Sequence, residues 1–336
     1  MDMKRFSREK LIHSLKHYTL NLILIWGAIL FYRNYDYYVN LLRPDTQAVL
    51  FYLALAYTVL GFLFYVIMPI ERIHQSKGSI IYGIFKRALI KKELKLEKQE
   101  KVTLLFLIVK IFFLPLMINF FFSNYYIFKS NLGGINGLSS LFSISSFNMM
   151  FYPIILSLIF LIDTLWFSFG YAFESGILKN TVRSVEPTFL GWAVALICYP
   201  PFNAFIVGLI PWYANDYVVL STPTLTFILR ILMVVLFLVY VSATLALGTK
   251  CSNLTNRGIV SRGPYKYIRH PAYISKTAAW WVTIIPFMNL LAFFSMLLWT
   301  GIYYLRAITE ENHLMKDPDY QKYCKKVKYK FIPGLW

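Results

Sequence analysis

Long apolar runs separated by shorter polar segments dominate the sequence. The runs cover residues 18–31, 48–70, 102–122, 148–170, 188–210, 223–247, 274–285 and 289–305. A helix that crosses a bilayer needs about 20 mostly apolar residues, and most of these runs approach that length. The last two runs are shorter and flank Pro286, so we expect two tilted helices or a hairpin that does not fully cross. The pattern predicts an all-α polytopic integral membrane protein with about eight transmembrane helices.

Composition and charge support a membrane protein and argue against nucleic-acid binding. Hydrophobic residues make up 58% of the 336 residues, whereas soluble domains usually contain about 45–50%. The net charge is +18, from 34 Lys+Arg and 16 Asp+Glu. In a membrane protein the positive-inside rule explains such an excess, so we expect no nucleic-acid partner. The three cysteines are isolated, which indicates neither a disulfide framework nor a zinc site.

The distribution of cations predicts the orientation of the helices. Cations gather in loops 74–101, 171–187 and 248–273 and in the C-terminal tail, whereas residues 123–147 hold one and residues 211–222 hold none. By the positive-inside rule both termini face the cytoplasm. Basic and apolar residues mix at near-helical spacing in 77–101, which fits either a helix on the inner leaflet or a solvated connector. The glycines at 133–137 and the serine-rich stretch 139–148 are expected to form an outer loop or re-entrant segment.

A dense polar and aromatic string, residues 262–273, lies between two apolar runs. It reads Arg-Gly-Pro-Tyr-Lys-Tyr-Ile-Arg-His-Pro-Ala-Tyr. Pro264 stiffens the turn that enters the membrane surface. Pro271 can open a helix, which leaves His270 beside unsatisfied backbone N–H groups that favour an anion. Each residue alone fits an interfacial anchor, but the whole string favours a functional site.

A second polar string, residues 306–314, follows the last apolar run. Arg306 and Glu310 are spaced to pair along a helix. Glu311 adds an adjacent carboxylate, and two such groups can grip vicinal hydroxyls or an ammonium group. His313 fits either a general base or a solvated side chain.

The motifs of the last quarter of the chain resemble those of the isoprenylcysteine carboxyl methyltransferase family, and related membrane phospholipid methyltransferases share the pattern. They are the run 263–273, an apolar hairpin, Glu310-Glu-Asn-His-Leu314, Tyr320-Gln-Lys-Tyr323 and Pro333-Gly-Leu335. The resemblance implies an S-adenosylmethionine-dependent methyltransferase without a Rossmann domain. It would act at the cytoplasmic membrane face on a lipid or on a lipidated or isoprenoid acceptor, such as a small prenylated molecule.

The resemblance also implies roles for individual residues. Catalytic roles fall on Arg306, His270 and Glu311. Arg306 would face the acceptor, with Asn253, or help to hold the carboxylate of the cofactor. A carboxylate acceptor would need the cation of Arg306, whereas an amine or hydroxyl would need a base such as His270, His313 or a glutamate. The cofactor site would comprise Tyr265, Arg269, His270, Pro271, Tyr273, Glu310 and Glu311.

The chain is expected to divide at the start of this methyltransferase-like region. Residues 247–336 would carry the chemistry, and the six spans of 1–246 would shape the acceptor cavity. Asp163 lies inside the fourth span, where an ionisable group is functional or paired, and we expect it to border that cavity with Glu174. The bacterial inner membrane and the endoplasmic reticulum both fit the short spans.

Three other functions stay open at this point. An NADPH-dependent sterol or enone reductase has a similar Arg-His-Pro-x-Tyr string and a tail like Tyr323-Cys-Lys-Lys-Val327. A transporter is less compatible, because the polar groups cluster at one surface. A scaffold protein would bind no cofactor. The methyltransferase pattern also departs at Ile274-Ser275-Lys276, where the family often has a glycine.

Overall fold

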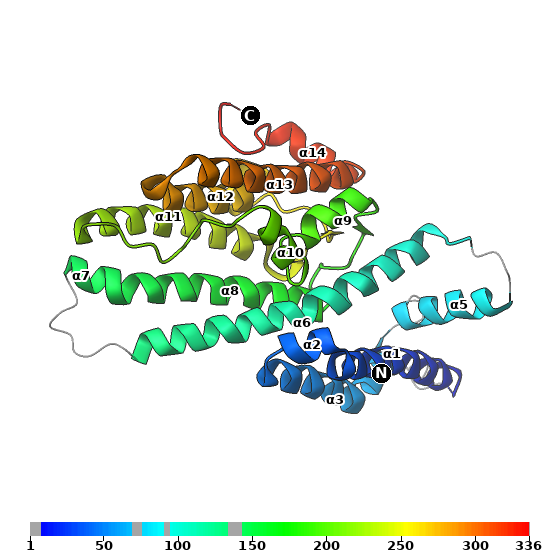
Figure 1. The fold of residues 1–336 in the computed structure, drawn as a ribbon. Coiled ribbons are helices and arrows are strands. Elements are labelled where there is room, and N and C mark those ends of the chain that lie inside the picture. The colour runs from blue at the N-terminus through cyan, green and yellow to red at the C-terminus, as the bar shows by residue number, and fades with distance from the viewer. Residues whose placement is uncertain (1–7, 69–75, 91–94, 134–142, 336) are drawn as a thin grey trace. The chain divides into compact units, whose positions relative to one another are not determined.

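A computed structural model describes residues 8–68, 76–90, 95–133 and 143–335 (Figure 1). The chain forms two compact units, Met1–Asn119 and Phe120–Trp336, and the boundary falls within helix α6 (Lys98–Gly133). These units are defined by packing, so the functional boundary at 246/247 stays a prediction. Most of the predicted outer loop, residues 134–142, and residues 91–94 of the mixed segment lie outside the described residues.

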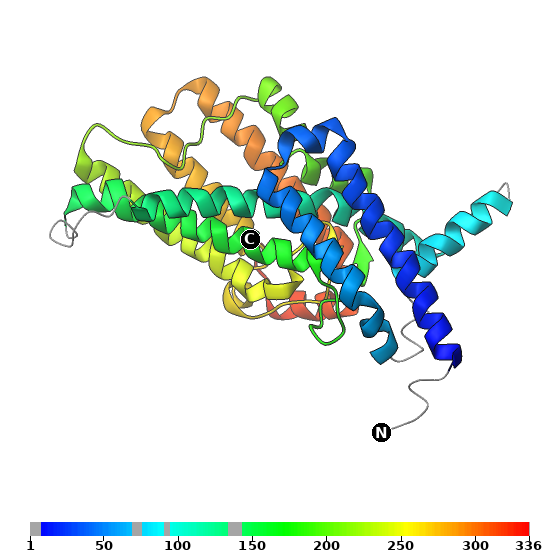
Figure 2. The same ribbon diagram turned by 90° about the horizontal axis from the view of Figure 1, so that it is seen from below.

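The first unit is built on two long helices that lie side by side, α1 (Arg8–Asn34) and α3 (Pro44–Ile67) (Figure 2). The short helix α2 (Asp36–Leu41) joins them. Polar groups also link the pair, since the Tyr18 hydroxyl donates to the carbonyl of Thr58 at 2.6 Å and the Trp26 indole donates to its hydroxyl at 3.0 Å. Such interhelical hydrogen bonds stabilise packing where the surroundings are as apolar as the helices.

Helix α5 (Lys77–Ile90) occupies most of the described part of the mixed segment. Ile81 and Ile84 are buried, whereas Phe85 and Leu89 are exposed by 63% and 88%. The helix therefore has an apolar face that the described residues of its own unit leave exposed. An inner-leaflet location would cover this face, and it stays a prediction.

In the second unit, long helices lie alongside one another in a layered bundle (Figure 1). Buried side chains of α8, α11 and α12, including Tyr152, Met233, Phe237 and Ala279, form its main core. The C-terminal helix α14 lies against the end of α13. The elements are α7 (Ile144–Ser146), the π-helical turn η3 (Phe147–Phe151), α8 (Tyr152–Ala172), α11 (Pro223–Leu247), α12 (Pro271–Ile284), α13 (Leu290–Leu314) and α14 (Pro318–Lys326).

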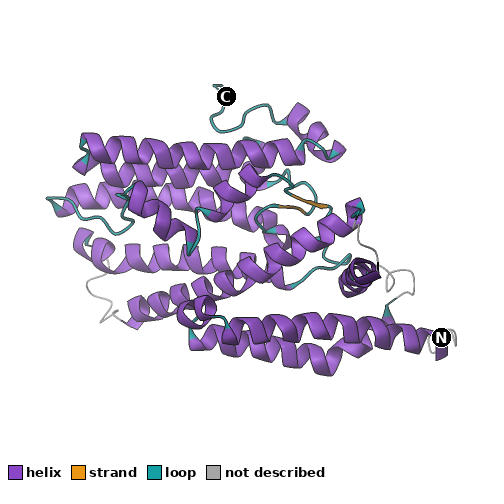
Figure 3. Ribbon diagram, turned by 45° about the vertical axis from the view of Figure 1, so that its right-hand side comes forward, coloured by secondary structure: helices purple, strands orange, loops and turns teal. Residues whose placement is uncertain are grey.

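A two-stranded antiparallel sheet ties two distant loops together (Figure 3). Strand β1 (Ser184–Val185) follows α8 and pairs with β2 (Thr255–Asn256), which follows α11. Gly170 permits a close approach nearby, because a Cβ there would lie 2.0 Å from the carbonyl oxygen of Cys251. The segment that leads into the polar string is thus fixed against the end of α8. In the described part of this unit, the connections include the 3₁₀ turns η4 (Gly248–Lys250), η5 (Gly263–Lys266) and η6 (Ile285–Phe287).

The all-α membrane class is confirmed, but the predicted number of eight spans is not. Among the residues that the structure describes, six helical segments are long and apolar enough to cross a membrane. They are Arg8–Asn34, Pro44–Ile67, Lys98–Gly133, Ile144–Ala172, Pro223–Lys250 and Leu290–Leu314.

The two remaining predicted spans differ for physical reasons. The run 188–210 forms two helices of eight residues, α9 (Phe189–Leu196) and α10 (Phe202–Leu209). Between them Pro200 and Pro201 lack the N–H groups that a continuous helix needs. Helix α12 has 14 residues, so it extends about 21 Å at 1.5 Å per residue, less than the ~30 Å hydrocarbon core. The orientation of the termini stays a prediction.

Candidate active site

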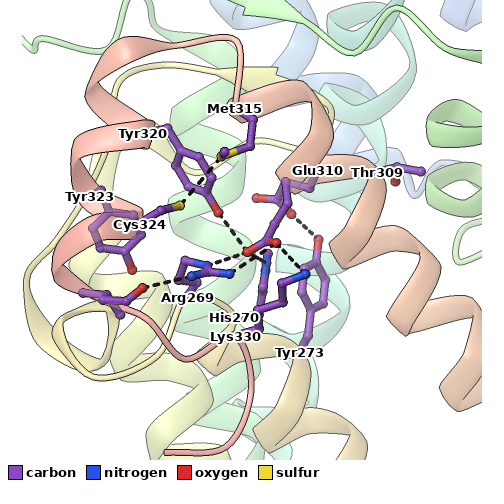
Figure 4. A network of polar contacts seen from close by, with 12 residues as sticks. Arg269, His270, Tyr273, Thr309, Glu310, Met315, Tyr320, Tyr323, Cys324 and Lys330 are labelled. Carbon is purple, nitrogen blue, oxygen red and sulfur yellow. Dashed lines mark hydrogen bonds and ion pairs between the residues drawn. The ribbon is translucent and has the colours of Figure 1, made fainter. Parts of the chain in front are cut away.

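The carboxylate of Glu311 is the centre of a buried polar cluster at the C-terminal end of α13. Figure 4 labels the surrounding Arg269, His270, Tyr320 and Lys330. Its Oε1 lies 2.6 Å from Arg269 Nε and 3.2 Å from His270 Nε2, and its Oε2 lies 3.2 Å from Lys330 Nζ. The Tyr320 hydroxyl also donates to Oε1, at 3.3 Å. A carboxylate has about four lone-pair sites, so these four contacts occupy its capacity to accept hydrogen bonds. One side chain therefore holds together the polar string, α13, α14 and the tail.

Backbone hydrogen bonds fasten the tail to the same place. The N–H groups of Arg269 and His270 donate to the carbonyls of Tyr329 and Lys330 at 3.0 and 2.9 Å. Arg269 Nη1 donates to the carbonyl of Val327 at 3.0 Å. Burial disfavours the charged guanidinium, but the hydrogen bond and charge of Glu311 outweigh it and raise the pKa of Arg269. Arg269 is therefore held in its cationic form at the position where the C-terminal tail packs against the polar string.

Tyrosines and a capping aspartate position α14. The Tyr323 hydroxyl donates to the carbonyl of Tyr265 at 2.6 Å. Asp317 caps the helix and accepts from Asn256 of β2 at 2.8 Å and from Arg183 at 3.0 Å. Burial would raise the pKa of Asp317, but these hydrogen bonds and the backbone N–H two residues on hold it below the ordinary value. The start of α14 is therefore anchored to the sheet by an ionised carboxylate.

Pro271 opens α12, which confirms the prediction from the His-Pro pair. His270 immediately precedes the helix and is buried, with its ring between those of Tyr273 and Phe331 at centroid distances of 5.6 and 5.4 Å. Its Nε2 lies 3.2 Å from Glu311 Oε1 without hydrogen-bond alignment. His270 is consequently held in place by packing between the two aromatic rings and by its position beside Glu311.

Glu310 and Arg306 do not form the ion pair that their spacing predicts. The Tyr273 hydroxyl donates to Glu310 Oε2 at 2.7 Å, and Figure 4 shows these two side chains facing each other. Arg306 Nη2 instead donates to Asn253 Oδ1 at 2.5 Å. The prediction of a local pair was wrong because both side chains are hydrogen-bonded to partners from other segments, Tyr273 and Asn253.

Arg306 is buried in a ring of tyrosines. Its guanidinium carbon lies 5.4 to 5.9 Å from the ring centroids of Tyr199, Tyr273 and Tyr303. Asn253, which accepts its hydrogen bond, is held in turn by the Tyr199 hydroxyl. A guanidinium carries five N–H donors, so a cation with this environment retains donors for an anionic ligand.

His313 is neither a solvated side chain nor an open base. Its Nε2 lies 2.8 Å from Ser184 Oγ and its Nδ1 lies 3.8 Å from Glu186 Oε2. The other oxygen of Glu186 accepts from the backbone N–H and the hydroxyl of Thr188. Because both ring nitrogens face protein groups, His313 is better suited to joining α13 to β1 than to direct proton transfer.

Asp163 and Glu174 occupy positions that hold local structure. Asp163 on α8 accepts from Tyr240 at 2.8 Å and from Thr244 at 2.6 Å, both on α11. Glu174 accepts from the backbone N–H of Val182 at 2.9 Å. The paired role that the sequence left open for Asp163 is therefore present, and a border with the acceptor pocket stays a proposal for both residues.

Sequence reasoning missed several residues of the site. Lys330 and Tyr320 complete the shell of Glu311, and Tyr199 and Tyr303 surround Arg306. The Tyr199-Pro-Pro break in an apolar run was the available signal for one of them. Tyr303 lies three residues before Arg306 on α13, a spacing that places both on one helix face. Lys330 and Tyr320 contact Glu311 only because the chain returns after α13, which spacing does not encode.

Comparison with known families identifies the region that holds this geometry. Residues 222–319 match the sequence model of the phospholipid methyltransferase family. A comparison with curated proteins gave no match. The matched segment includes Asn253, Arg269, His270, Arg306 and Glu311. The predicted resemblance is thereby confirmed for the C-terminal region, and the chain is a multi-pass membrane protein with a region of the methyltransferase type.

Proposed function

We propose that the chain is an integral membrane S-adenosylmethionine-dependent methyltransferase that acts on a lipid or a lipidated or isoprenoid acceptor at the cytoplasmic face. The observation that carries this proposal is the meeting of Arg269 and His270 with Glu311, some 42 residues further along the chain. These residues lie in the segment that matches the phospholipid methyltransferase family. No comparable finding favours the reductase, the transporter or the scaffold.

The residues present fit the functional groups of S-adenosylmethionine. Glu310 is exposed, and among the described residues only Tyr273 donates a hydrogen bond to it, so its carboxylate can still accept from an ammonium group or from ribose hydroxyls. The tyrosine faces suit a flat ring or a cationic sulfonium. When bound, this cofactor supplies a methyl group activated by an adjacent positive sulfur.

Glu311 and His270 are better assigned to positioning than to contact with the donor. The carboxylate of Glu311 is already occupied by Arg269, His270, Lys330 and Tyr320. It fixes the polar string and the tail, and so sets where the neighbouring Glu310 points. In-line displacement depends mainly on alignment and on exclusion of water, and a rigid shell provides both.

Arg306 favours an acceptor with a negative charge. A buried cation that has an amide and aromatic rings as neighbours is stabilised further by a carboxylate or a phosphate. A prenylcysteine carboxylate and a phospholipid phosphodiester both meet this requirement. We infer that Arg306 orients the acceptor through this charge, with Asn253 holding the guanidinium in place.

Calorimetric titration of S-adenosylhomocysteine into detergent-purified protein tests the donor assignment. We expect binding to the wild type, about tenfold weaker binding to Glu310→Gln because a charge-assisted hydrogen bond is lost, and unchanged binding to the exposed-surface control Lys322→Gln. NADPH is titrated in parallel. Binding of NADPH without binding of S-adenosylhomocysteine would contradict the proposal.

A further inference from the structure

Four cations gather where α11 ends and the polar string begins. Repulsion from Arg183, Arg262 and Lys179 acts on the ammonium group of Lys250. Arg262 Nε is anchored by the carbonyl of Ala246 at 2.9 Å, in the last turn of α11. Like charges in one place are unfavourable unless an anion accompanies them, so this cluster calls for a physical explanation beyond topology.

Gly258 forms the floor of the cluster. A Cβ on Gly258 would lie 3.2 Å from both Arg183 Nη2 and Lys250 Nζ. The two cationic groups are therefore separated by no more than twice that distance, and they point toward the same spot. Gly258 has a φ of +90°, a conformation that other residues rarely adopt. The two cationic groups thus pack directly against Gly258, at a position where any side chain would crowd them.

The nearby carboxylates do not neutralise this cluster of cations. Asp317 and Asp319 accept from Nη1 of Arg183, at 3.0 and 2.8 Å, whereas Nη2 faces Gly258. The pKa of Arg183 is raised by its hydrogen bonds to these two aspartates, which outweigh burial. Arg183 is consequently positively charged in the folded protein. The two negative charges of Asp317 and Asp319 are fewer than the four positive charges of the cluster.

We propose that Lys250 and Arg183 form a phosphate-binding site beside Gly258 and that Arg262, held at the end of α11, adds to its positive charge. A phosphate offers several acceptor oxygens, and Lys and Arg bind it through charge-assisted hydrogen bonds. The site lies at the end of a predicted membrane span, where clustered cations meet anionic headgroups. The ligand is a phosphate group, carried either by an anionic lipid or by a free phosphate ion. The proposal does not depend on methyl transfer.

Two binding measurements on the full-length protein separate the two sources. In nanodiscs of phosphatidylcholine with phosphatidic acid, native mass spectrometry counts anionic lipids that stay bound. In detergent, the thermal midpoint is measured with inorganic phosphate and with sodium chloride at equal ionic strength, because a ligand of the folded state raises that midpoint. The variants are Lys250→Gln, its charge-conserving partner Lys250→Arg, and the control Lys322→Gln.

We expect the wild type to retain phosphatidic acid or to be stabilised by phosphate, with affinity about tenfold weaker in Lys250→Gln, restored in Lys250→Arg and unchanged in Lys322→Gln. Retained lipid identifies a headgroup and stabilisation by phosphate identifies a free ion, and either supports the site. Equal binding by wild type and Lys250→Gln would overturn it. If Lys250→Gln does not fold, Arg262→Gln takes its place with the same expectation.

Discussion

Replacing Glu311 by Gln keeps the shape of the side chain and removes the charge at the centre of the site. The change leaves Arg269 and Lys330, whose side chains are 9% and 26% exposed, without their shared carboxylate. Removing one partner of a buried pair costs about 3–5 kcal/mol. Because Lys330 can turn toward water, we take the lower end, about 3 kcal/mol.

The thermal midpoint should fall accordingly. A domain of the size of Phe120–Trp336 loses about 2–4 °C per kcal/mol, so the expected decrease is about 6–12 °C. Hydrogen exchange gives a local readout, since the amides of Arg269 and His270 donate to the tail. Both amides should exchange faster in Glu311→Gln.

The neighbouring Glu310 supplies a matched control. It is exposed and bonds to Tyr273, so Glu310→Gln should shift the midpoint by only a few degrees at most while weakening donor binding. A midpoint and exchange rates in Glu311→Gln equal to those of the wild type would refute the role of Glu311 as the organising carboxylate.

Further substitutions test other parts of the site. Arg306→Gln should reduce methyl transfer by about a hundredfold, by loss of an orienting charge-assisted contact, and leave the thermal midpoint within a few degrees; unchanged turnover would contradict its role. The depressed pKa of Asp317 means that its stabilisation is complete above about pH 4 and is lost as pH falls through the folded-state value. Protection factors of the α14 amides, which correct for the intrinsic pH dependence of exchange, should therefore fall on acidification in the wild type, and a similar fall in Asp317→Asn would exclude this group. Gly170→Ala should lower the free energy of unfolding by about 1–3 kcal/mol, because the added methyl group overpacks against Cys251. An unaltered unfolding midpoint would contradict the close approach.

Hydropathy predicted the helices whose whole length is apolar. The runs 48–70 and 223–247 correspond to α3 and α11 within a few residues, because length and apolarity suffice to specify a span. The run 188–210 failed because averaged hydropathy does not register two prolines, which divide α9 from α10. Helix α6 extends beyond its predicted run at both ends, where polar residues continue the helix.

The motifs predicted the residues at the centre of the site, whereas some of the surrounding residues could be identified only from the structure. The resemblance placed Arg269, His270 and Glu311 together, and the structure brings them into contact. The resemblance also placed Asn253 with Arg306 on the acceptor side, and the structure joins these two by a hydrogen bond. The contact from Lys330 could not be predicted, because it depends on the tail returning to the cluster. Local spacing suggested the wrong partner for Arg306, because Asn253 lies on a distant segment.

Methyl transfer itself is the most direct test of the proposed activity. Purified protein is incubated with S-adenosylmethionine labelled in its methyl group, in nanodiscs that contain phosphatidylethanolamine or a prenylcysteine analogue, and label in the acceptor fraction is counted. We predict label in the acceptor with the wild type and a large loss with Arg306→Gln and Glu310→Gln. Label that is absent from every acceptor, in protein that is folded and binds NADPH instead, would contradict a methyltransferase.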